Sequence, residues 1–114
     1  MAKDDYYVLV ARILVYLYAR VKGKDKRKPE EFLIPMSDDF PVTKEYFEFV
    51  ITEMERHGYI QIQIIKAWGG KIVEMDIPGI QITQEGIDYL IENSKVRKAA
   101  KLIPAAASIA ELFV

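Results

Sequence analysis

Two basic stretches contain the side chains best suited to bind a ligand. The stretch from Arg20 to Lys28 has six positive charges and one negative, and a second stretch places a tryptophan between lysines around Gly69-Gly70. Ammonium and guanidinium groups bind the phosphates of nucleic acids. We therefore predict contacts to double-stranded DNA, with the tryptophan probing a groove. The residues predicted to make them are Lys22, Lys24, Lys26, Arg27, Lys28, Lys66, Trp68 and Lys71.

Each stretch also has a purely structural interpretation. A basic run after a helix complements the negative end of the helix dipole and keeps a loop hydrated. Trp68 can fold back on the first helix or pack in an oligomer instead of meeting DNA. The sequence leaves both interpretations open.

The residue types that support catalysis are missing or scattered. The sequence contains no cysteine and one histidine, which excludes thiolate nucleophiles and cysteine-ligated zinc. It shows no nucleophile-base pairing, phosphate-binding glycine loop or metal-ligand spacing. His57 suits a helix end, where it meets the negative pole of the dipole. We therefore predict a protein that is not an enzyme and needs no cofactor or metal.

Charge is segregated along the chain and supports a second hypothesis. The net charge of −1 divides into +5 for residues 1–29, −9 for residues 30–94 and +3 for residues 95–114. Four carboxylates on a helix that begins after Thr43 would repel phosphates. The alternative is therefore a protein-interaction module that does not bind DNA. Its predicted contact face consists of Lys44, Glu45, Glu48, Thr52 and Glu53.

Hydrophobic spacing and capping residues define the elements that position these side chains. We predict one helix from Asp5 to Val21, a second that Thr43 caps and Gly58 ends, and a third that Thr83 caps. Between the last two helices lies a hairpin. This order predicts an α+β fold of the winged helix-turn-helix type, with a β-hairpin wing and further C-terminal helices.

The hairpin register follows from a turn at Gly69-Gly70. Such a turn sets Trp68 opposite Lys71, and it brings the apolar residues of both strands to one face. The predicted pairs are Ile64 with Met75 and Ile62 with Ile77, with Val73 on the same apolar face.

The segment before the Thr43 helix and the C-terminal end depart from a simple winged helix. We predict a short strand at Leu33-Ile34, one capped helical turn over residues 37–40, and a shortened second helix, because Pro35 and Pro41 interrupt the segment. Residues 1–94 are predicted to form the winged-helix domain. Residues 95–114 form a basic, alanine-rich helical extension, kinked or restarted at Pro104, that packs on the first helix or in a dimer interface.

The N-terminal sequence favours a cytoplasmic protein. Two acids follow Lys3, where a secretory signal needs positive charge, and Arg12 interrupts the apolar run after them. The run is too polar to span a bilayer.

Three segments resemble one known family. They run from Asp38 to Phe47 (DDFPVTKEYF), from Gly58 to Ile60 (GYI) and from Ile82 to Leu90 (ITQEGIDYL). Together they are similar to the YjcQ family of small bacterial and phage proteins, over nearly the whole chain from the first helix to Lys101. The resemblance implies a winged-helix fold and a bacterial or prophage setting. It implies no established activity and no functional residues, so a DNA-binding, transcription-regulatory role rests on the basic stretches and on a winged-helix fold that often binds DNA.

Overall fold

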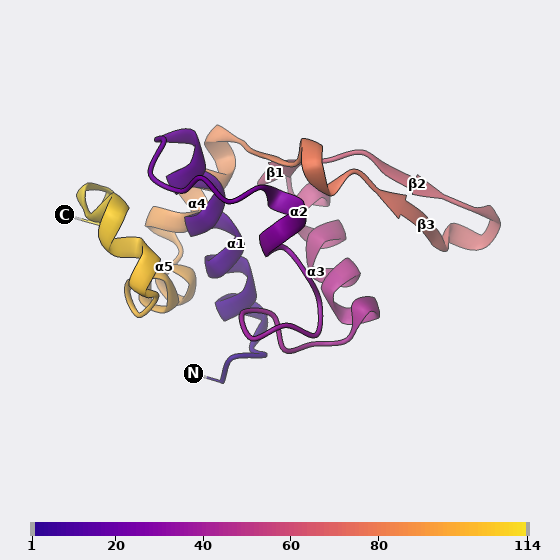
Figure 1. Ribbon diagram of the computed structural model, residues 1–114, viewed down its shortest axis with the longest axis horizontal. Helices are drawn as coiled ribbons and strands as arrows, with labels where there is room; N and C mark the ends of the chain where they lie inside the picture. Colours follow the sequence, from indigo (N-terminus) through magenta and orange to yellow (C-terminus); the bar gives the residue numbers. More distant parts are fainter. Residues whose placement is uncertain (1, 114) are drawn as a thin grey trace.

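The protein has a mixed α+β architecture in which helices surround one central helix and a hairpin projects from the body (Figure 1). The computed structural model describes residues 2–113. In chain order the elements are α1 (Tyr6–Val21), α2 (Pro29–Phe32), α3 (Lys44–Arg56), β1 (Ile60–Gln61), β2 (Ile64–Lys66), η1 (Trp68–Gly70), β3 (Ile72–Met75), η2 (Ile77–Gly79), β4 (Gln81–Ile82), α4 (Gln84–Glu92), α5 (Ser94–Lys101) and η3 (Pro104–Phe113).

Helix α1 is the centre of the core, and its predicted bounds are confirmed. The Asp5 side chain caps the helix by accepting a hydrogen bond from the backbone N–H of Tyr7 at 2.9 Å. Helices α3, α4 and α5, strand β4 and η3 all contact α1, so it is covered on several sides. Its buried residues are Val8, Leu9, Val10, Ala11, Ile13, Leu14, Val15, Tyr16, Leu17 and Ala19.

The C-terminal segment supplies much of this cover. Helix α5 begins after Asn93, whose side chain accepts hydrogen bonds from two backbone N–H groups, and η3 begins at Pro104. Val96 and Ala99 are buried in the same core as α1, and their small size allows the helices to approach closely. These residues are therefore occupied within the chain. A dimer through the rest of the segment, where Leu102 is exposed, stays a prediction, as does the independence of residues 1–94.

The connection between α1 and α3 differs from the expected one. Leu33 and Ile34 form no strand, and residues 37–39 are bends instead of a helical turn. The single helical turn, α2, lies earlier, because Pro29 favours the first position of a helix and Pro35 ends the regular backbone. Met36 adopts a positive φ of 59°, which reverses the chain.

A chain of aromatic rings compensates for this short second helix. Phe32 of α2 packs on Tyr16 of α1 with ring centroids 4.6 Å apart, and Phe40 lies 5.3 Å from Phe32 and 5.4 Å from Phe47 of α3. Large aromatic side chains bury much apolar area each. They connect α1 to α3 through a connection that has little regular structure.

Helices α3 and α4 begin at the predicted capping residues, and α3 ends as predicted. Thr43 and Thr83 cap them through their hydroxyls, and Gly58 ends the α3 segment with a φ of 80°. Gly86 in the first turn of α4 lies against the backbone of Tyr59, so close that an added Cβ would stand 2.1 Å from its carbonyl oxygen. Only a residue without a side chain allows α4 to lie this close to the backbone that leads into β1.

The strands form two separate antiparallel pairs. Strand β1 pairs with β4, while β2 pairs with β3, so the hairpin predicted between the last two helices is present but shorter than expected. The predicted pair of Ile64 with Met75 is confirmed. Ile62 does not pair with Ile77, because Ile77 starts the η2 turn that the fixed φ of Pro78 favours.

Candidate interaction surfaces

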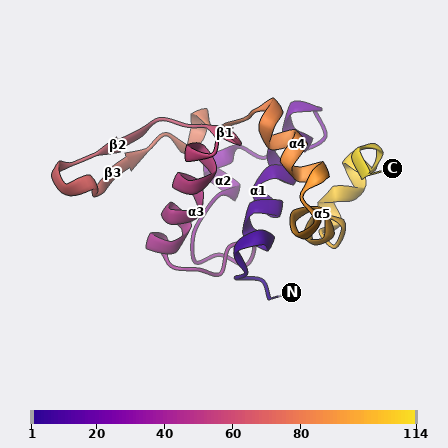
Figure 2. The ribbon, with the colours of Figure 1, turned by 180° about the vertical axis from the view of Figure 1, so that it is seen from behind.

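The segment of residues 64–75, called here the projecting hairpin, extends away from the helices (Figures 1 and 2). Strands β2 and β3 make their main contacts with each other. At the tip, the backbone N–H of Ala67 donates to the carbonyl of Lys71 at 2.7 Å, and Gly69 and Gly70 both have φ of 82°. Trp68 therefore lies in the η1 turn and has no partner across the ribbon, so the predicted pairing with Lys71 is wrong.

A β-bulge changes which side chains face solvent. Lys66 pairs with Ile72 while Ile65 pairs with Glu74, so β3 carries one extra residue, Val73. Val73 is 66% exposed and Ile65 55%, whereas Ile72 is half-buried. The prediction that Val73 joins the covered apolar face is wrong, because the bulge gives that place to Ile72.

The tip residue Trp68 is fully exposed. It folds back on no part of residues 2–113, which removes that interpretation for the monomer. Lys66 and Lys71 are exposed too, and neither forms an ion pair within residues 2–113. Within residues 64–75 Glu74 offsets one of the two lysines, so the ribbon has a net charge of only +1. Its exposed surface is chiefly apolar.

A groove of about 560 Å³ separates the hairpin from α3. Strand β2 forms one wall. One edge of this strand pairs with β3, and its other edge is free. The opposite wall comes from Thr52, Glu55 and Arg56 in the C-terminal half of α3. The arrangement offers an extended segment both backbone hydrogen-bonding groups and charged side chains.

The exposed face of α3 is acidic and carries an aromatic patch. Lys44, Glu45 and Glu55 are exposed, Glu48 and Thr52 are half-buried, and Glu53 pairs with Arg56 at 3.3 Å. The residues predicted as a protein-contact face therefore lie on one helix.

Sequence analysis missed Phe49, which belongs to this face of α3. Its ring is 53% exposed and stacks on Tyr46 at a centroid distance of 6.1 Å. Tyr6 of α1 meets the edge of Phe49, and burial raises the pKa of Tyr6 to about 12. Its spacing of three residues from Tyr46 was the signal that could have identified this patch.

The basic loop, residues 22–28, is partly neutralised from within. The Arg27 guanidinium binds both carboxylate oxygens of Asp25, at 3.0 and 2.5 Å, and lies 4.0 Å from the ring centre of Phe32. These hydrogen bonds from Arg27 hold the pKa of Asp25 below its usual value, and in return they raise the pKa of Arg27. The carbonyl of Arg27 accepts bonds from Tyr16 and Arg20. Arg27 thus anchors the loop to α1 and α2.

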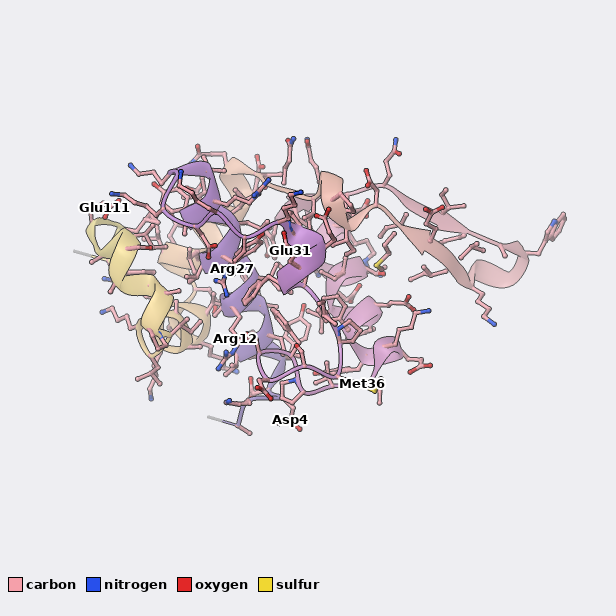
Figure 3. All side chains as sticks on the ribbon, in the orientation of Figure 1. Asp4, Arg12, Arg27, Glu31, Met36 and Glu111 are labelled. Atoms are coloured by element: carbon pink, nitrogen blue, oxygen red, sulfur yellow. The ribbon has the colours of Figure 1, made fainter. Side chains whose placement is uncertain are left out.

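The lysines of the loop remain on the surface, far from the hairpin. Lys24, Lys26 and Lys28 are exposed and form no ion pair within the described residues, and Lys22 pairs weakly with Glu111 at 3.8 Å. Figure 3 shows Glu111 at the end of the molecule opposite the projecting hairpin. The longest dimension is 46 Å. The structure does not bring the two predicted phosphate-binding stretches together.

Histidine and carboxylate side chains do not gather into a metal-type cluster within residues 2–113. His57 ends α3 and stacks on Tyr59 at 5.6 Å, in agreement with its predicted structural place. Within residues 2–113 no three His, Asp or Glu side chains converge as a metal site would require. In the same part of the chain, no helix has the length and hydrophobicity to cross a membrane.

Comparison with known proteins places the chain in a family. A model of the YjcQ protein family matches residues 12–107 of the 114. The chain belongs to the YjcQ family. No curated protein and no solved structure matched it.

The YjcQ-family match covers the helical body and the whole projecting hairpin. It begins within α1 at Arg12 and ends in η3 at Ala107. The segments that carried the resemblance, residues 38–47, 58–60 and 82–90, are the entry to α3, the start of β1 and most of α4. The last two segments lie near the base of the hairpin, whereas residues 38–47 lie at the opposite end of α3. The segments include Thr43 and Thr83, which cap α3 and α4.

Proposed function

We propose that this YjcQ-family chain is a non-enzymatic protein-binding module with a winged-helix frame. In this proposal α3 occupies the recognition position and the projecting hairpin is the wing. One observation carries the proposal: Ile65, Trp68 and Val73 are exposed on a ribbon that makes its main contacts only within itself.

Leaving these side chains in water gains nothing for folding. A contiguous apolar surface on a small protein typically marks a binding site, and a tryptophan often supplies a large share of binding energy. The free edge of β2 adds unpaired backbone groups that an extended partner segment can meet. The groove against α3 gives such a segment a second wall.

The acidic face of α3 supports a protein partner over DNA reading. Base edges are read by Arg, Lys, Asn or Gln, while Glu45, Glu48 and Glu55 would lie near phosphates. A basic peptide segment suits the acidic residues of this face through charge complementarity, and an apolar segment suits its aromatic patch.

The test is affinity purification from a bacterial lysate with wild-type protein and two variants, followed by binding measurements with the purified partner. Trp68→Ala removes the tip, and Lys98→Glu changes an exposed charge on α5, outside the hairpin. We expect a partner that wild type and Lys98→Glu retain and Trp68→Ala loses by about tenfold or more in affinity. Equal binding by all three proteins would refute the proposed surface. Reversal of Glu45, Glu48 and Glu53 tests the α3 face in the same way.

A second candidate is DNA binding through phosphates, in a regulatory role. It is favoured by the exposed lysines Lys66 and Lys71 beside Trp68, together with those of the basic loop. Fluorescence anisotropy of a labelled random duplex, at low and physiological salt, tests it. Affinity that falls steeply with salt and is lost on lysine-to-glutamate changes in loop and hairpin would support DNA over protein. Absence of binding at low salt would exclude it.

A further inference from the structure

An open pocket of about 530 Å³ lies between the basic loop and the segment through which the chain returns from the hairpin. Its walls come from the end of α1, the loop, η2 and β4. Segments more than fifty residues apart in the sequence thus form one concavity. Its volume lies in the range typical of small-molecule sites, about 300 to 1,000 Å³.

The pocket combines an apolar interior with a cationic rim. Leu17 and Ile80 are buried beneath it, and Val21, Pro78 and Ile82 expose apolar atoms to it. Val21 is notable because an apolar residue at the end of α1 gains nothing from solvent exposure. A hydrocarbon chain would cover this surface.

The charges that face the pocket are unbalanced. Lys26 forms no ion pair within residues 2–113, and Arg20 donates only to the backbone carbonyl of Arg27. The one carboxylate in the wall, Asp25, has both oxygens bound by Arg27. The remaining charge is therefore positive, and a bound anion would meet it without displacing an internal pair.

We propose that this pocket binds a single molecule of a small anionic amphiphile, with a carboxylate or phosphate head and a short hydrocarbon chain. Lys26 and Arg20 bind the head, and the chain lies along Val21, Pro78 and Ile82. The pocket is separate from the projecting hairpin and its partner, so the inference stands or falls independently of the proposed function.

Fluorescence of anilinonaphthalene sulfonate, an anionic aromatic probe, tests the site in the full chain. We expect saturable binding of one probe per chain and displacement by monomeric decanoate. Lys26→Glu should weaken probe and decanoate about tenfold, because a repulsive charge replaces an attractive one. Val21→Gln should weaken them by removing apolar contact. Lys98→Glu has the same charge change on an exposed part of α5, and it should leave binding unchanged.

Further measurements distinguish this pocket from the other exposed apolar surfaces of the chain. Trp68→Ala should bind the probe as wild type does; loss of binding would place the probe on the hairpin and overturn the inference. Equal affinities of Lys26→Glu and wild type would overturn it too. Displacement by inorganic phosphate as effective as by decanoate would refute the hydrocarbon contact. Binding to phosphatidylglycerol vesicles without displacement by decanoate would refute a monomeric ligand. Circular dichroism checks that each variant is folded.

Discussion

Helix α1 and the projecting hairpin both contain many apolar residues yet differ completely in their surroundings. Ten residues of α1 are buried by α3, α4, α5 and η3, whereas no residue of the segment 64–75, all of which the structure describes, is buried. Ile and Val in α1 contribute to the free energy of folding. Ile65 and Val73 contribute little to it, so folding alone does not explain why they are apolar.

The difference teaches where to look for a binding function in a small protein. Burial in the core is a sufficient reason for the apolar residues of α1. The hairpin is stabilised by its own turn and by few other contacts, and isolated two-stranded ribbons are marginally stable in water. A partner that covers the ribbon would therefore stabilise it as well as bind it.

The largest difference is expected when one apolar side chain is shortened to alanine in each of the two regions. Leu14→Ala in α1 should lower the free energy of unfolding by about 3 kcal/mol, because it leaves a cavity in a fully buried site. Ile65→Ala in the hairpin should change it by less than about 0.5 kcal/mol. Urea denaturation followed by circular dichroism measures both. Similar losses in the two variants would mean that the hairpin packs against the body.

Glycine substitutions give the next largest contrast. Gly86→Ala should cost about 2 kcal/mol, because its Cβ would collide with the carbonyl oxygen of Tyr59 and force α4 away. The added Cβ of Gly70→Ala in the hairpin meets no atom within 4 Å. This variant should lower stability only through its positive φ, by about 1 kcal/mol. Thermal unfolding of both variants provides the measurement. A larger loss at Gly70 would show that the turn, and not the body, limits stability.

The ion pair of the basic loop should show a pH dependence that the hairpin lacks. Asp25→Asn should lower stability by about 1 kcal/mol at neutral pH. The pKa of Asp25 is lowered in the folded state, so its contribution is complete above the ordinary value of 3.8 and is lost as the pH falls below it. Denaturation from pH 7 to pH 3 should therefore narrow the stability difference between wild type and Asp25→Asn. A constant gap for Asp25→Asn would contradict the assignment.

The smallest expected effect is that of Trp68→Ala on folding. Stability should change by less than about 0.5 kcal/mol, because the side chain is fully exposed. Trp68 is the sole tryptophan, so its emission reports on the tip alone. The emission maximum of the wild type should equal that of free tryptophan in water and shift to shorter wavelength when a protein covers the hairpin. A blue-shifted maximum in the isolated protein would indicate self-association.

Local rules explain what the sequence could predict. The bounds of α1, α3 and α4 follow from Asp5, Thr43 and Thr83 and from helical spacing, because caps and periodicity act within a few residues. Such local rules could not predict the β-bulge at Val73. Ile72 and Val73 are adjacent and both β-branched, so alternation fits either one on the covered face.

The contacts of the basic loop also could not be predicted from the sequence. Arg27 looks like any other cation in its run, but Phe32 and Tyr16 come beside it only after α2 folds back on α1. The distance between loop and hairpin likewise depends on the packing of the whole chain. The charge at each position was readable from the sequence, while the grouping of these charges in space was not.

The cover of α1 by the C-terminal segment has a consequence for synthesis. A ribosome completes α1 long before it makes α5 and η3, which close over Val15 and its neighbours. Until residues near Ile109 have emerged, an almost entirely apolar helix lacks its cover, and such surfaces attract chaperones and one another. The nascent chain therefore cannot complete the burial of its first helix until α5 and η3 have left the ribosome.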